Sequence, residues 1–198
     1  MKTLFVLIIT SLMLISVGCT KDQSTEPAMS GGEFYSDENI AGQISVLPKT
    51  EITPEISEGL LYMREEEKVA RDIYIALGNK WNLKVFKNIA TSEQRHMDAI
   101  KVLIDRYELK DPVGENKEGV FSDIELQKLY NDLLAEGMKS SKDALLVGKL
   151  IEEVDIKDLD IHLKNVTNES DISFVYQNLK KGSVNHLNAF LQNLRRMP

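Results

Sequence analysis

Apolar residues recur at alternating spacings of four and three along most of the chain after residue 51, and no segment there alternates apolar and polar residues as a strand does. That period places the apolar side chains on one face of a helix. The chain has only 11 glycines and 5 prolines among its 198 residues, which is also typical of a helical protein. We therefore expect an all-α domain with one core.

Start and stop signals divide this region into four long helices and one short helix. Gly78 is expected to end the first helix, Ser122 and Glu125 form a capping box for the short third helix, and Ser140 or Ser141 caps the fourth. The link between the second and fourth helices is long, and it contains the short helix. One long crossover in an otherwise short-looped bundle is the connectivity of ferritin-like four-helix bundles. The expected helices span residues 53–77, 83–107, 122–137, 140–162 and 171–193.

Each long helix carries polar residues in the middle of the apolar seam that should face the core. Burying an unpaired carboxylate there is costly, so each interruption needs partners, and the other interruptions are the partners available. Two of the three histidines of the chain belong to this set. The interruptions are Glu67, then Glu93 and His96, then Glu152 and Asp155, then Ser183 and His186.

A metal site explains this pattern. Glu93 and His96 are three residues apart, as are Glu152 and Asp155, so each pair lies on one face of its helix. Carboxylates crowded in a core repel one another and take up protons, and divalent cations remove that repulsion. Two such ions contribute four positive charges against the four carboxylates, and mixed carboxylate and imidazole ligation suits iron or manganese, with zinc as a further alternative. The predicted metal ligands are Glu67, Glu93, His96, Glu152, Asp155 and His186.

The alternative to a metal site is a buried ion-pair network, in which Arg64, Arg71 or Arg95 neutralises the acids. In that case the domain is a metal-free interaction module.

Other charged residues near the predicted ligands are not expected to bind the metal. Glu65 and Glu66 are expected on a solvated face of the first helix. Glu153 exchanges roles with Glu152 if the fourth helix is rotated, and His162, near a helix end, is given no role.

The N-terminal segment predicts an exported protein. Residues 1–18 contain Lys2 followed by an apolar run that is too short to span a membrane and has the size of a secretory signal. The run ends at Ser16-Val17-Gly18-Cys19, which resembles the lipobox of bacterial lipoproteins. This resemblance implies cleavage before Cys19, lipidation of that residue, and anchoring to a membrane of the cell envelope. An ordinary signal peptide cut after Gly18 is the alternative.

Residues 19–52 are polar and lack a sustained period, so they predict a flexible tether on which a few apolar residues such as Ile44 and Val46 dock. Thr20, where an Asp would favour inner-membrane retention, implies an outer-membrane destination through the same resemblance. The domain organisation is then a signal peptide over 1–18, a tether over 19–52 and a helical bundle over 53–198.

Charge and cysteine content exclude other classes of protein. A net charge of −7 argues against nonspecific nucleic-acid binding. The single cysteine excludes an internal disulfide framework, a cysteine-built zinc site and a cysteine-ligated iron–sulfur cluster. A redox protein of this kind would therefore need an electron donor from outside the chain. A homodimer of the acidic bundle is left open.

The motif Glu67, Ala70 and Tyr74, followed by Glu93-x-x-His96, resembles rubrerythrin-type members of the ferritin-like di-iron superfamily. The region from about residue 56 to 194 also resembles an uncharacterised bacterial domain-of-unknown-function family placed in that superfamily. The resemblance implies that Glu93 bridges two ions.

In the same resemblance, Glu67 is the first-helix ligand and His96 is a terminal ligand. Glu152 and Asp155 are the acidic ligands of the fourth helix, and His186 is the terminal imidazole of the last helix.

Ser183 departs from the superfamily pattern, which has Glu-x-x-His in the last helix. Either Asp155 supplies the missing charge, or the second metal is held loosely, or only one metal binds. The expected function is a membrane-anchored di-iron protein that oxidises iron or removes peroxide, with catalytic residues undetermined. The alternative is a noncatalytic metal-binding module of the envelope.

Overall fold

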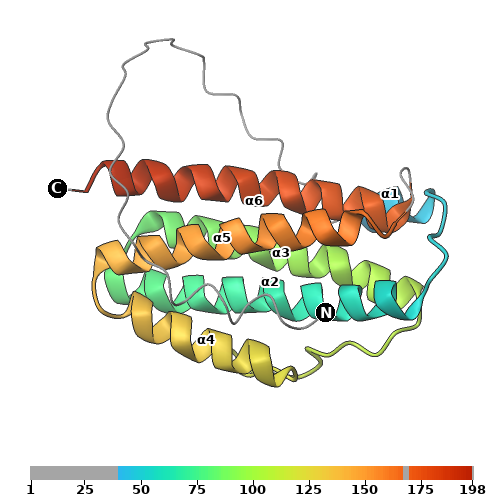
Figure 1. Cartoon of the computed structure of the whole chain (residues 1–198), viewed down its shortest axis with the longest axis horizontal. Helices are drawn as coiled ribbons and strands as arrows, with labels where there is room; N and C mark the ends of the chain where they lie inside the picture. The colour runs from blue at the N-terminus through green and yellow to red at the C-terminus, as the bar shows by residue number, and fades with distance from the viewer. Residues whose placement is uncertain (1–39, 167–169, 198) are drawn as a thin grey trace, which may run out of the picture. The chain divides into compact units, whose positions relative to one another are not determined.

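The computed structural model describes residues 40–166 and 170–197, and its regular structure over these residues is entirely helical. Four long helices lie side by side, and two shorter ones pack against them (Figure 1). The long helices are α2 (Pro54–Trp81), α3 (Lys84–Arg106), α5 (Ser141–Leu163) and α6 (Asp171–Arg195), and the short ones are α1 (Ile40–Ser45) and α4 (Ile124–Gly137). The predicted all-α bundle is therefore confirmed.

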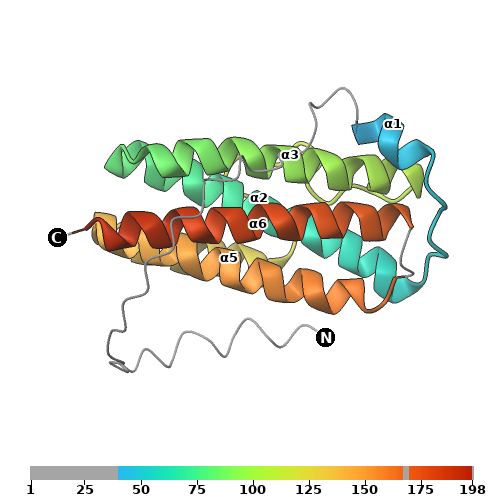
Figure 2. The same cartoon turned by 90° about the horizontal axis from the view of Figure 1, so that it is seen from above.

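Two helical hairpins, α2 with α3 and α5 with α6, make the bundle, and Figure 2 shows them from a second side. The crossover between the hairpins contains α4, which packs on α2 and α5. This is the predicted ferritin-like connectivity, with one long crossover between otherwise short links. No helix in the described part of the chain is long and apolar enough to cross a membrane.

Helix α2 begins where the sequence predicts and ends later. The Thr53 side chain accepts a hydrogen bond from the backbone N–H of Ile56, and Pro54 occupies the first turn. Gly78, the predicted end, lies inside the helix, which continues to Trp81 and ends at Asn82 in the left-handed conformation (φ 51°). The lack of a side chain at Gly78 serves helix packing instead, because a Cβ there would lie 3.1 Å from Cβ of Phe86.

The other helix starts differ from prediction by a residue at most. Asp123, rather than Ser122, caps α4 and accepts from the backbone N–H groups of Glu125 and Leu126. Ser140, one of the two alternatives, caps α5 by accepting from the N–H of Asp143.

Residues 40–52, which are part of the predicted tether, include a helix and pack on the bundle. Helix α1 contacts α3 and α6, and Ile44 is fully buried in the core, as its predicted docking requires, whereas Val46 is exposed. The Thr50 backbone N–H and hydroxyl donate to Asp171, and the Asp171 N–H donates to the carbonyl of Pro48. The signal segment, Cys19 and the rest of the tether lie outside the described residues.

The apolar seams meet in the centre of the bundle, as the periodicity predicts. One end of the core is aliphatic and includes Leu60, Ile100 and Leu179. The other end is aromatic, where the rings of Phe86 and Phe190 lie 5.3 Å apart. The polar interruptions lie between these two apolar regions, so they are held away from water.

Candidate metal centre

The six predicted ligands are all buried, and none is more than 8% exposed. Each of the four long helices contributes at least one of them: Glu67 from α2, Glu93 and His96 from α3, Glu152 and Asp155 from α5, and His186 from α6. The sequence therefore identified a set of charged side chains that the fold does place in the core.

Five of the six form two groups that share Glu93. His96 Nδ1 lies 3.2 Å from Glu67 Oε2 and 2.8 Å from Glu93 Oε2. His186 Nδ1 lies 2.9 Å from Glu93 Oε1 and 3.5 Å from Glu152 Oε2. In each group the three ligand atoms lie within 4.8 Å of one another. The two oxygens of Glu93 thus face opposite groups.

Asp155 lies beside these groups but belongs to neither of them. It is buried on α5, and its Oδ1 has no hydrogen-bond partner among the residues described. The Ser183 hydroxyl donates to the carbonyl of Leu179, 3.0 Å away, within its own helix. Asp155 is therefore the carboxylate available where the last helix carries a neutral serine.

Neighbouring residues orient the ligands. The Tyr74 hydroxyl donates to Glu152 Oε1 at 2.7 Å, whereas Glu153 is exposed and forms an ion pair with Lys149. The alternative in which α5 is rotated and Glu153 replaces Glu152 in the core is therefore wrong.

Gly182 lies against the edge of the His96 ring that points away from the carboxylates. A Cβ at Gly182 would lie 2.6 Å from His96 Nε2, so the glycine makes room for this edge of the ring against α6. The opposite nitrogen, Nδ1, faces the carboxylates of Glu67 and Glu93. The rings of His96 and His186 are stacked, with centroids 5.4 Å apart.

The electrostatics of the cluster favour charged imidazoles next to Glu93. Burial alone would lower the histidine pKa values, but the carboxylates outweigh it, raising the pKa of His186 to about 10 and that of His96 well above its usual range. Burial likewise would raise the pKa of Glu93, but the His186 and His96 imidazoliums outweigh it and lower that pKa.

The outer carboxylates bind protons more tightly than usual. Burial, followed by repulsion from Glu93, raises the pKa of Glu152 to about 8. Burial is also the main reason that the pKa of Asp155 rises to about 7. Without a metal ion the cluster therefore holds protons near neutral pH, and these are the charges that metal cations would replace.

Orphaned buried atoms provide a test of whether metal ions fit this cluster. Within the described residues, four atoms of the cluster have no hydrogen-bond partner: Glu67 Oε1, Glu93 Oε1, Asp155 Oδ1 and His186 Nδ1. His186 Nδ1 and Glu93 Oε1 are close but not aligned for a hydrogen bond. Because buried polar atoms are nearly always satisfied, a cation between them would supply the missing partner. The carboxylate and imidazole donors fit two divalent ions.

Two of the three arginines of the alternative ion-pair network are bound to other residues. Arg64 pairs with Asp111, with Nη2 to Oδ2 at 3.1 Å, and donates to the carbonyl of Met97. Arg71 pairs with Asp72 and donates to Gln94. Arg64 and Arg71 therefore do not neutralise the carboxylates of the cluster in the way that the ion-pair alternative predicted.

The expectation that Glu65 and Glu66 lie on a solvated face is wrong, since both are buried. Glu65 accepts hydrogen bonds from the backbone N–H groups of Ser122 and Asp123, at 2.5 and 2.9 Å. Residues of the crossover thus cover this face of α2. One feature of the sequence could have predicted this burial. Three consecutive glutamates lie between Met63 and Val69, and consecutive helix residues point in different directions, so the three cannot share one helix face.

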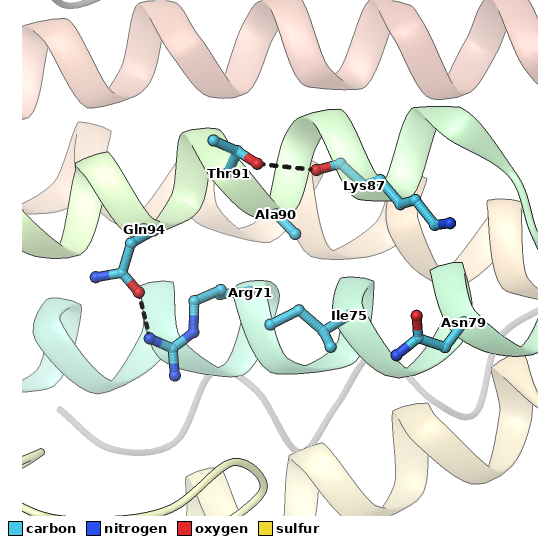
Figure 3. Close-up of a pocket in the computed structure, with 7 residues that line it drawn as sticks. All are labelled: Arg71, Ile75, Asn79, Lys87, Ala90, Thr91 and Gln94. Carbon is cyan, nitrogen blue, oxygen red and sulfur yellow. Dashed lines mark hydrogen bonds between the residues drawn. The ribbon is translucent and has the colours of Figure 1, made fainter. Parts of the chain in front are cut away.

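A groove lies between α2 and α3 (Figure 3). None of the six predicted ligands lines it. The side chains that do are Arg71, Ile75, Asn79, Lys87, Ala90, Thr91 and Gln94.

A family model described as an uncharacterised protein domain (DUF2202) matches residues 56–197, which include all six predicted ligands. The chain belongs to the DUF2202 family. The predicted membership of a domain-of-unknown-function family is therefore confirmed, and the description of this family names no activity.

This DUF2202 chain is 54% identical over 151 residues to the uncharacterised protein MJ0754 of Methanocaldococcus jannaschii, a match that covers 76% of this chain and 81% of the relative. A crystal structure of the hypothetical protein MJ0754 from Methanococcus jannaschii superposes with a TM-score of 0.73 and 53% identity, over 75% of this chain and 85% of that one. The DUF2202 bundle therefore has an archaeal counterpart, and the family is not restricted to bacteria as the sequence resemblance had implied.

Proposed function

We propose that this DUF2202 protein binds two iron ions in the cluster around Glu93 and that it is a redox protein of the ferritin-like di-iron type. One observation carries the proposal: the two oxygens of a buried Glu93 face two separate groups, each with one histidine and one further glutamate. The sequence motif Glu67, Ala70, Tyr74 and Glu93-x-x-His96 supports the same assignment by resemblance.

Each residue has a defined task in this proposal. Glu67 and His96 would hold one ion, Glu152 and His186 would hold the other, and Glu93 would contribute to both. Iron bound in such a set supplies one-electron redox chemistry toward dioxygen, peroxide or ferrous iron. The apolar ends of the bundle exclude water from the ligands, and the Tyr74 hydroxyl keeps Glu152 in place. Electrons would come from a partner protein or small molecule.

Metal analysis of the purified full chain tests the proposal, both as isolated and after anaerobic loading with ferrous iron. The expected result is about two irons per chain, followed by oxygen uptake and ferric absorption on exposure to air. Glu93→Gln and His96→Ala should lose the iron, and Glu153→Gln, on the exposed face of α5, is the matched control. No bound metal in either preparation, with stability unchanged by a chelator, would contradict the proposal.

A second candidate is a metal-binding module without redox activity, with manganese or zinc in place of iron. Ser183 favours it, because its hydroxyl is bound to the Leu179 carbonyl and α6 then contributes one ligand, His186. One metal per chain without oxygen uptake would select this function. In that case Ser183→Glu should raise the number of bound ions.

We also propose that Cys19 is lipidated and anchors the domain in the cell envelope, with the outer membrane as its destination. The support is the sequence of residues 1–19 alone. Expression in a bacterial host with labelled fatty acid should label the wild-type protein, and Cys19→Ser should abolish both the label and membrane fractionation. A labelled Cys19→Ser variant would refute the anchor.

A further inference from the structure

The groove between α2 and α3 has a volume of about 420 Å³, which is within the range of small-molecule sites (Figure 3). Its lining includes two cations, Arg71 and Lys87, and no carboxylate. This composition is unexpected in a chain whose net charge is −7. No residue of the lining has a part in the function proposed above, so that function does not explain the groove.

The two cations lie at opposite ends of the groove. Figure 3 shows Arg71 at one end, beside Gln94, and Lys87 at the other end. Between the two ends, Ile75 and Ala90 form an apolar wall. Gln94 and Lys87 are about two turns apart on α3, so the groove is roughly 10 Å long.

The Arg71 end has more positive than negative charge, although Arg71 is bound to a carboxylate. Arg71 Nη2 lies 2.7 Å from Asp72 Oδ1, and the other oxygen of Asp72 binds the buried Lys68 at 2.5 Å. These three side chains together therefore carry one net positive charge. Within the described residues, the bonds of Arg71 to Asp72 and Gln94 use three of its five N–H groups, so two are left for a ligand.

Positive charge also gathers at the Lys87 end. Lys87 is exposed in the second turn of α3, and the first turn contains Lys84 and no acidic residue. Because Leu83 provides no side-chain cap, the partial positive charge of the helix N-terminus adds to that of the lysines. Asp98, which accepts from the Gln94 amide at 2.8 Å, is beyond the opposite end and does not line the groove.

We propose that the groove binds an elongated small dicarboxylate, with one acidic group at Arg71 and the other at Lys87. The two cations set the separation of the acidic groups, and the apolar wall between them suits a methylene chain. The inference does not depend on the metal centre. Further hydrogen bonds to the ligand are available from the remaining polar side chains of the lining, Asn79, Thr91 and Gln94.

Nuclear magnetic resonance titration of the labelled full chain tests the groove, with octanedioate, octanoate and butanedioate as probes. The ionic strength is held constant, because salt weakens exposed ion pairs. Octanedioate is expected to bind about fivefold more tightly than octanoate, which has one charge fewer, and than butanedioate, which is too short to reach both cations. The shifted resonances should come from the residues that line the groove.

Two variants separate the Lys87 contact from general charge attraction. Lys87→Gln removes the charge and keeps most of the side chain, so it should bind octanedioate no more tightly than octanoate. Lys84→Gln removes an exposed charge of the same helix that lies outside the lining, and it should bind octanedioate as the wild type does.

Several outcomes would overturn the groove proposal. These are equal affinity of the wild type for octanedioate and octanoate, unchanged octanedioate affinity in Lys87→Gln, and resonance shifts confined to other parts of the chain. The metal proposal fails separately, because a protein that binds octanedioate and no metal contradicts only the metal centre. A protein that binds iron and not octanedioate contradicts only the groove.

Discussion

At the scale of single residues, Glu93 is the side chain on which the candidate centre depends. Its two oxygens lie within 3 Å of two different imidazoles, which hold its pKa below the usual range. Neutralising it would leave the stacked rings of His96 and His186 without the carboxylate that both contact. Removal of one partner from such a buried set is costly, because the remaining charges lose their compensation.

The raised pKa values predict that the metal-free protein loses stability as the pH rises. Glu152 and Asp155 bind protons more tightly when folded than at their ordinary pKa values of 4.5 and 3.8, so the folded protein loses stability as the pH rises from those values to about 8 and about 7. The contribution of His186 is present below 6.5 and lost toward about 10. The melting temperature with a chelator should therefore fall between pH 6 and pH 9.

Bound metal ions should reverse this dependence, because they replace the protons of the cluster and bind better when it is deprotonated. Thermal unfolding with chelator and with Mn²⁺, at several pH values, makes the comparison. A melting temperature of the metal-free protein that rises over the same interval would refute the assignment of these protons.

Gly182 is predicted to be required for metal binding. Gly182→Ala places a Cβ 2.6 Å from His96 Nε2, so the ring has to move away from the position that aims Nδ1 at Glu67 and Glu93. We expect metal affinity to fall at least tenfold. The free energy of unfolding should also fall by about 1–3 kcal/mol through overpacking, although Ala is the better helix former.

Calorimetric titration with Mn²⁺ and urea unfolding measure these two effects. Lys181→Ala, at the neighbouring exposed position of α6, is the matched control. A Gly182→Ala protein that gains stability and binds metal normally would show that His96 is held by something else.

At the scale of elements, the crossover between the hairpins covers a charged face of α2. Lys68 is fully buried, bound to Asp72 at 2.5 Å and to the carbonyl of Lys117 at 2.8 Å. Asp72 in turn accepts from the backbone N–H of Gly119. Glu65 accepts from the N–H groups just before α4. Buried charged side chains of α2 thus form hydrogen bonds with backbone N–H and carbonyl groups of the crossover loop. These backbone groups lie outside regular secondary structure, so they need such partners.

Glu65→Ala is predicted to destabilise the protein by about 2 kcal/mol, because the backbone N–H groups of Ser122 and Asp123 lose their acceptor. The free energy of unfolding in urea measures the change. Glu58→Ala, on an exposed face of the same helix, should alter it little. Equal effects of the two substitutions would mean that water replaces the carboxylate of Glu65 at no cost.

At the scale of the whole molecule, the bundle includes a segment that precedes its first long helix. Ile44 is fully buried between α3 and α6. Asp171, at the start of α6, accepts from Thr50 and from the Tyr107 hydroxyl and forms an ion pair with Arg106. Residues 40–50 therefore close one end of the core and connect the two hairpins.

Deletion of residues 40–50 is predicted to lower the stability of the bundle. A chain beginning at residue 51 exposes the site filled by Ile44 and removes partners of Asp171, so we expect a loss of about 3 kcal/mol relative to a chain beginning at residue 40. Urea unfolding of the two chains gives the difference, and Ile44→Ala in the longer chain should account for part of it. Equal stability would show that the segment lies on the bundle without strengthening it.

The sequence by itself determined the four long helices, their buried seams and the six charged residues that meet in the core. This was possible because a helix repeats its faces every few residues, so an apolar seam and its polar interruptions are visible locally. The Ala and Tyr spacing after Glu67 and the Glu-x-x-His motif carried the resemblance to di-iron proteins for the same reason.

Only the tertiary structure decided what covers the other faces of these helices. The burial of Glu65 and Glu66 depends on the crossover and on α5, which are distant in sequence, and Gly78 lies within a helix because Phe86 packs against it. The docking of Ile44 and the sharing of Glu93 between two histidines are likewise contacts between remote segments. Local periodicity shows which face of a helix is apolar. The segments that cover its charged face depend on how whole helices pack together.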